Sequence, residues 1–189
     1  QYREGIDQKC FTPQYHGRKH FWADSWMKDL RENTRGAREL FDERCHGGLS
    51  LLQGEGWRYH SEYIDWKTGQ TPTEEKIYDS VKQDLDIFEK LFGFRSLSVI
   101  PPHYIFTPEV EKVWRNLGVR YVQGAGYRLI RKSNGSNQIK SHYLGEISPQ
   151  NLIYSIRTVK FDPRPSRPQH HWQSALEQIE TNFKRGVPA

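Results

Sequence analysis

The feature that most constrains the fold is an alternation of helix and strand signals between residues 73 and 123. The strongest helix has apolar side chains at the spacing of one helix face, namely Ile77, Val81, Leu85, Phe88, Leu91 and Phe92. Gly93 ends that helix, and 96–100 then reads as a short buried strand. A second helix over 107–117 precedes a second strand over 119–123. This rhythm predicts an α/β fold with parallel strands, whose functional groups gather where strands end.

Weaker signals surround this centre. We expect helices over 23–32, 34–45 and 174–183, a strand over 152–161, and loops over 49–69 and 131–140. The sequence contains no internal repeat and no interdomain linker. We therefore expect residues 1–189 to form a single domain. Because the chain opens on Gln1 and stops directly after a helix signal, we also expect that domain to be incomplete.

Composition excludes several classes of protein. Hydrophobic residues make up 35% of the chain and charged residues 27%, which is typical of a folded protein. The longest apolar runs, such as 97–102, are too short to cross a bilayer, so we expect a soluble protein without a membrane segment. The net charge of +5 is scattered among acidic residues, and we expect no nucleic-acid partner. The two cysteines, Cys10 and Cys45, lack the spacing of a zinc ribbon.

The first candidate site is the segment His16-Gly17-Arg18-Lys19-His20. On a helix, residues four apart face the same side, so the two imidazoles could reach one divalent ion. A zinc peptidase with this spacing needs glutamate after the first histidine, and Gly17 stands there instead. With eight histidines in the chain, such a pair also arises by chance, and two satisfied polar residues at a strand-to-helix junction remain the alternative.

The second candidate is the turn Pro101-Pro102-His103-Tyr104, which follows the expected strand over 96–100. Pro102 has no N–H, whereas the backbone N–H of His103 or Tyr104 could stabilise an oxyanion. A rigid loop closed by an aromatic plug is the alternative. Other flat side chains could form platforms for sugar rings: Trp57, Tyr59, Tyr63, Trp66 and Tyr104.

The order of these two motifs resembles the polysaccharide deacetylase family, also called the NodB-like carbohydrate esterases. His16-Gly17-Arg18-Lys19-His20 looks like its His-Ser/Thr-x-x-His motif, with glycine where a hydroxyl residue is usual. Pro101-Pro102-His103-Tyr104 is similar to its Arg-x-Pro-Tyr motif. The flanking segments 11–26 and 94–124 resemble a bacterial branch of the family.

The resemblance implies part of a distorted (β/α)7 barrel with a divalent metal, usually zinc. It implies His16 and His20 as metal ligands and His103 and Tyr104 as substrate-binding residues. The implied reaction removes an acetyl group from a polysaccharide or cell-wall glycan. The bacterial cytoplasm or cell envelope is the implied compartment.

Departures from the family pattern leave a second function open. No Asp-Asp pair precedes His16, so the third metal ligand and the general base are unidentified. We therefore expect residues 1–189 alone to be an inactive fragment of the hydrolase. Ile100 stands roughly where the family has arginine. The alternatives are a catalytically degenerate barrel that binds glycans without hydrolysing them, and a structural domain without metal. The glycan, the metal and the oligomeric state are not fixed by the sequence.

Overall fold

The architecture is α/β, as the helix and strand signals predict. It is described by a computed structural model that covers residues 2–45, 59, 61–66, 68–132, 134–162, 164 and 171–187. Three short parallel strands form a sheet in the order β1-β2-β5. Within the residues covered, the strands form no closed barrel. No described helix is both long and apolar enough to span a bilayer.

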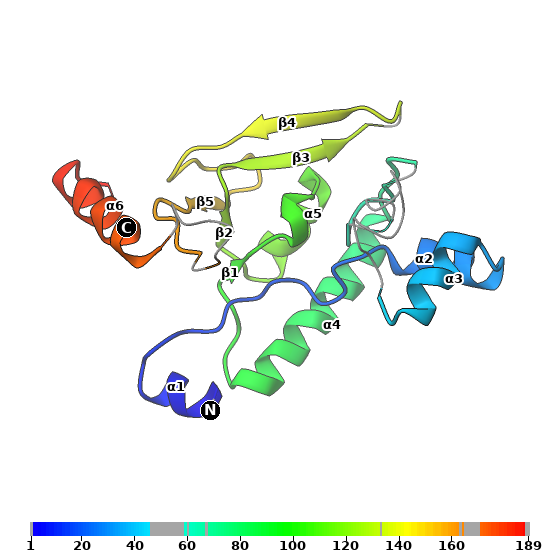
Figure 1. The fold of residues 1–189 in the computed structure, drawn as a ribbon, viewed down its shortest axis with the longest axis horizontal. Coiled ribbons are helices and arrows are strands. Elements are labelled where there is room, and N and C mark those ends of the chain that lie inside the picture. Colours follow the sequence, from blue (N-terminus) through cyan, green and yellow to red (C-terminus); the bar gives the residue numbers. More distant parts are fainter. Residues whose placement is uncertain are drawn as a thin grey trace.

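The centre of the fold is the helix and strand alternation over 73–123. Helix α4 (Glu74–Phe92) leads to β1 (Ser98–Val99), and α5 (Pro108–Asn116) leads to β2 (Tyr121–Gly124). The side chain of Thr73 accepts a hydrogen bond from Lys76 N and caps α4, and Gly93 ends it in the left-handed conformation. All four predicted elements are confirmed, although β1 is shorter than expected. Figure 1 shows α4 and α5 beside one another near β1 and β2.

The third strand, β5 (Ile153–Ile156), pairs with β2 so that Val122 lies opposite Tyr154. It is shorter than the strand expected over 152–161. One further residue extends the sheet on its other side, because Tyr15 forms a parallel bridge with Val99. Four chain segments therefore run in the same direction, and residues that follow them lie at one edge.

The segment 131–140 was expected to be a polar loop, and that prediction is wrong. Strands β3 (Tyr127–Arg131) and β4 (Asn137–Ser141) pair as an antiparallel hairpin, with Gly135 at φ +80° in the turn between them. Every residue of β4 is exposed, so the strand has no buried face and no apolar alternation to reveal it.

The remaining helices lie at the periphery. Helix α1 (Tyr2–Asp7) was not predicted, whereas α2 (Ala23–Arg31), α3 (Arg35–Asp42) and α6 (Trp172–Lys184) match expected helices. His171, rather than Ser174, is the N-cap of α6. Figure 1 places α2 and α3 at one end of the long axis and α6 at the other.

The main core lies between the sheet and helices α4 and α5. Its fully buried members include Val81, Leu85, Val99, Val110, Trp114, Val119 and Leu152. Trp114 packs edge-on against Tyr63, with 5.7 Å between ring centroids. The apolar stripe of α4 fixes the helix against the strands that carry the candidate site, as its spacing predicts. The prediction is wrong for Leu91, which is exposed in the last turn of the helix.

Two leucines of α4 test this core. Leu85 is 0% exposed and Leu91 is 59% exposed. Leu85→Ala should lower the free energy of unfolding by about 2–5 kcal/mol, because it leaves a cavity in packed surroundings. Leu91→Ala should change it by less than about 0.5 kcal/mol. Urea denaturation of both variants makes the comparison, and equal losses would contradict the assigned face of α4.

Candidate functional site

The two candidate motifs leave neighbouring parallel segments at the same edge. His16 follows Tyr15 directly, and Ile100 follows Val99, the residue that Tyr15 pairs with. The N–H of Ile100 donates to the carbonyl of Tyr15 over 2.8 Å. The histidine segment and the proline turn therefore begin side by side at the carboxyl ends of their strands, where α/β proteins place functional groups.

The segment 16–20 is not a turn of helix, so the predicted reason for the meeting of His16 and His20 is wrong. Its backbone turns through Gly17 at φ +73° and His20 at φ +59° instead. The rings still converge, with 3.0 Å between their Nε2 atoms, 4.6 Å between centroids and an angle of 77°. The spacing of the two histidines correctly predicted that their rings meet, but the helical conformation expected for the segment is wrong.

The ring of His16 is held by the proline turn. Its Nδ1 lies 2.6 Å from the carbonyl oxygen of Ile100, a contact in which the imidazole N–H must donate. The proton of the neutral ring is therefore on Nδ1, and the lone pair is on Nε2, which faces His20. Histidines that bind metals are commonly oriented by such a bond from the other ring nitrogen.

A third ring joins the pair from the proline turn. His103 Nε2 lies 3.2 Å from Nδ1 of His20, and the two ring centroids are 4.8 Å apart. His103 and Tyr104 have φ values of +52° and +58°, a conformation that non-glycine residues rarely adopt and that is concentrated at functional sites. The three imidazoles form a row with His20 in the middle.

The other proposed roles of the turn are only partly compatible with the geometry. The N–H of Tyr104 donates to the carbonyl of Pro101 over 3.0 Å, so the turn itself uses this candidate oxyanion donor. The ring of Tyr104 is half-buried and meets Tyr127 edge-on, with centroids 5.6 Å apart. Tyr104 therefore belongs to an aromatic wall beside the histidines.

Three of the expected sugar platforms are interior residues. Tyr59, Tyr63 and Trp66 are 2%, 2% and 7% exposed, and that prediction is wrong for them because they pack in the core. Trp57 lies outside the described residues. Of the four that the structure describes, Tyr104 alone is placed where it can meet a ligand.

Glu62 holds the backbone of the histidine segment, and nothing in its sequence context marks it out. Its carboxylate accepts hydrogen bonds from the N–H of Arg18 over 3.3 Å and of His20 over 3.4 Å. A Cβ at Gly17 would collide with this carboxylate and would come within 2.7 Å of Pro102 Cγ. This contact explains why glycine stands where the resembling motif has serine or threonine.

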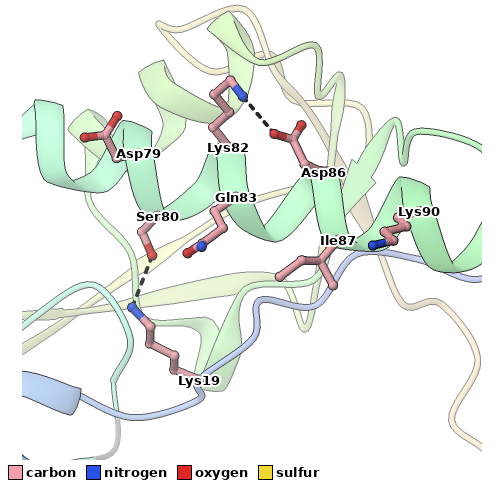
Figure 2. A pocket seen from close by; sticks show the side chains of 8 residues that line it. All are labelled: Lys19, Asp79, Ser80, Lys82, Gln83, Asp86, Ile87 and Lys90. Atoms are coloured by element: carbon pink, nitrogen blue, oxygen red, sulfur yellow. Dashed lines mark hydrogen bonds and ion pairs between the residues drawn. The ribbon is translucent and has the colours of Figure 1, made fainter.

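The side chains of the segment are anchored to α4. Arg18 Nε pairs with the buried Asp84 carboxylate over 3.0 Å, and Lys19 Nζ donates to Ser80 over 3.3 Å. Figure 2 shows the Lys19 contact, in an open groove of about 610 Å³ that contains none of the three histidines. His16 instead lines another groove, of about 460 Å³, together with Arg18 and apolar residues of α4.

Two buried carboxylates thus lie beneath the segment. Burial raises the pKa of Glu62 above its ordinary value, and the neighbouring Asp84 raises it further. Burial also raises the pKa of Asp84, against the opposing effect of Arg18 and Lys19. The backbone and side chains of the segment are therefore held by two carboxyl groups whose pKa values are raised by burial.

The histidine pair fits two ligand positions of a divalent ion. Zinc binds imidazole nitrogen at about 2.0–2.1 Å, so two nitrogens on a tetrahedral ion lie about 3.3 Å apart. The observed 3.0 Å is close to this, and the tautomer of His16 leaves its lone pair available. Among the described residues, no group of three or more His, Cys, Asp or Glu side chains is arranged to hold a metal. His103 faces the opposite nitrogen of His20 and does not share this position.

Comparison with known proteins adds no assignment: no family model, curated protein or solved structure matches the chain.

Two glycines with left-handed backbone test the packing at Gly17. Gly93→Ala meets nothing within 4 Å and should cost about 1–2 kcal/mol of stability from its φ of +81° alone. Gly17→Ala should cost more, because the new methyl also displaces Glu62 or Pro102. Thermal and urea unfolding measure the difference, and a loss at Gly17 no greater than at Gly93 would contradict the close packing.

The raised pKa of Glu62 gives a pH prediction. Between its ordinary pKa of 4.5 and the raised value, the folded protein binds more protons than the unfolded chain, so stability falls as pH rises through that window. In Glu62→Gln this fall should be smaller, because one of the two buried carboxyls with a raised pKa is removed. Urea unfolding between acid and neutral pH, in the presence of a chelator, compares the slopes. Identical slopes would show that Glu62 is not perturbed.

Proposed function

We propose that this chain is part of a metal-dependent hydrolase that removes acetyl groups from a polysaccharide or cell-wall glycan, on a barrel of the polysaccharide deacetylase type. The observation that carries the proposal is the meeting of His16 and His20, whose Nε2 atoms are 3.0 Å apart at the carboxyl edge of a parallel sheet. The class of reaction, deacetylation, comes from the resemblance of segments 16–20 and 101–104 to two motifs of that family, in the same order.

In this proposal His16 and His20 hold the ion, and zinc suits imidazole ligands. A bound divalent ion would polarise the acetyl carbonyl and lower the pKa of a bound water. The Ile100 carbonyl keeps His16 in the tautomer with a free Nε2, and His103 orients the ring of His20 from its other nitrogen. The general base and a third ligand remain unassigned.

The surroundings suit an extended neutral substrate. The exposed ring of His16 lines a groove of about 460 Å³, which gives a substrate a path to the pair. Tyr104 presents an aromatic edge beside His103, and flat rings of this kind contact sugars through their apolar faces. Carbohydrate is therefore the partner that we propose.

A second candidate is a glycan-binding domain without hydrolase activity. It is favoured by the way the three imidazoles can satisfy one another without an ion. His103 can donate to His20 Nδ1, His20 can donate to His16 Nε2, and His16 donates to Ile100. Each ring is then neutral and each bond has one donor, so the row is stable as a purely structural network.

Zinc retention and acetate release test the proposal together. Zinc should stay bound after dialysis, and the complete enzyme should release acetate from chitin oligomers or peptidoglycan. His16→Ala should lower the affinity for zinc by more than about tenfold. Removing a residue that only hydrogen-bonds to a metal ligand lowers metal affinity roughly 10–100-fold, and removing a ligand itself should lower it at least as much. The matched control is His171→Ala, an exposed N-cap far along the chain, which should leave zinc unchanged.

The outcomes separate the candidates. Chitin binding by a zinc-free wild-type protein, without acetate release, would favour the glycan-binding domain. Equal zinc affinity in His16→Ala and wild type would remove the metal assignment.

A further inference from the structure

A fourth histidine, His142, has a buried side chain and lines a cavity together with Tyr104. It follows β4 directly, and its side chain is 3% exposed. Its ring stacks on Tyr154 of β5, with centroids 3.8 Å apart and planes within 17°. The backbone N–H of His142 donates to the carbonyl of Gly126 over 2.9 Å, which ties the residue to the start of the hairpin.

The tautomer of the neutral ring is set by Glu146. His142 Nδ1 lies 3.1 Å from Glu146 Oε1, while the N–H of Tyr143 donates to the other carboxylate oxygen over 3.1 Å. Partial burial alone would raise the pKa of Glu146, but the hydrogen bonds from His142 and Tyr143 bring it below its ordinary value. Glu146 is thus an anionic acceptor, and the neutral imidazole carries its proton on Nδ1 and its lone pair on Nε2.

That lone pair has no protein partner in the part of the chain that the structure describes. Nε2 of His142 is fully buried and makes no hydrogen bond. Buried polar atoms are nearly always satisfied, so an orphaned nitrogen indicates a missing ligand or solvent molecule. The ring is also fixed by stacking and by Glu146, so it cannot easily turn to find another partner.

His142 is one of the residues that line a small cavity at the carboxyl ends of β2 and β5. The cavity has a volume of about 10 Å³, room for roughly one water molecule or one hydroxyl group. Its walls are mainly apolar and aromatic and include Tyr104, Phe106, Val122, Tyr127 and Ile156. Tyr127 is 40% exposed and Tyr104 is half-buried, so these two rings connect the cavity to the surface.

We propose that this cavity is a carbohydrate subsite, in which one sugar hydroxyl donates to His142 Nε2 while the ring lies against Tyr104 and Tyr127. The ligand must offer a hydrogen-bond donor, because Nε2 is an acceptor. It must be neutral at that point, because the apolar wall would not compensate a charge. A hydroxyl on a sugar ring meets both demands, and the aromatic mouth matches the apolar face of the ring.

The identity of the ligand rests on the proposed function, since the same turn carries His103 and Tyr104. The subsite itself stands on the orphaned nitrogen and the cavity, and it serves a hydrolase or a glycan-binding domain equally.

A matched pair of variants tests the subsite on the full chain with chitotriose as the probe. His142→Phe keeps the stacking on Tyr154 but has no ring nitrogen, and its affinity should be about five- to tenfold weaker, the loss of one hydrogen bond. The control His171→Phe replaces an exposed histidine that does not line the cavity, so its affinity should stay within about twofold of wild type. Isothermal titration calorimetry measures all three proteins.

Wild-type NMR keeps the test independent of how His142→Phe folds. In a long-range proton–nitrogen correlation spectrum, the Nε2 resonance of His142 should move on titration with chitotriose, with the same Kd as the calorimetry. An unmoved resonance at saturation, or undiminished affinity in folded His142→Phe, would overturn the subsite and leave an ordered water as the partner of Nε2.

The same measurements separate this inference from the proposed function. Acetate release by wild type with unchanged chitotriose affinity in His142→Phe would overturn the subsite alone. Weaker binding by His142→Phe in a chain without zinc or acetate release would support the subsite and count against the hydrolase.

Discussion

The ion pair between Arg18 and the buried Asp84 is the constraint on which the candidate site depends. It ties a segment with almost no regular structure to α4, the most firmly packed helix, over 3.0 Å. The Asp84 side chain is 1% exposed but that of Arg18 is 37% exposed, so water screens the pair and it is worth less than a fully buried one. Glu62, from a separate loop, also holds the segment, because its carboxylate accepts hydrogen bonds from the backbone N–H groups of Arg18 and His20. Together, Asp84 and Glu62 form a frame around the segment. The frame replaces the helical turn that would otherwise align the histidines.

This frame lets an irregular segment present two imidazole nitrogens in a fixed relation. Left-handed backbone at His20, His103 and Tyr104 is costly, and such conformations persist only where the surroundings enforce them. Here the surroundings are buried carboxylates and a proline turn. The Nε2 atoms of His16 and His20, 3.0 Å apart, can bind an ion or form a hydrogen bond with each other. Whether they bind an ion is what distinguishes the two proposed functions.

The elements that could be predicted from the sequence are those whose apolar residues recur at the spacing of a helix or strand. The stripe of α4 and the glycine stop at Gly93 identified the helix, and the βα rhythm identified parallel strands. The hairpin over 127–141 was missed because β4 is exposed on both faces, and Tyr63 and Trp66 were misread because loop residues carry no periodic sign of burial. His16 and His20 were found by spacing alone. Glu62 and Asp84 could not be found, since each contacts the segment across more than forty positions and neither belongs to a motif.

X-ray absorption spectroscopy of the zinc-loaded protein tests the central claim most directly, because it reports the atoms bound to the ion. The account predicts a first shell with two imidazole nitrogens at about 2.0–2.1 Å, accompanied by the multiple-scattering signal of histidine rings. A shell of oxygens without imidazole scattering, or a protein that retains no zinc to measure, would contradict it.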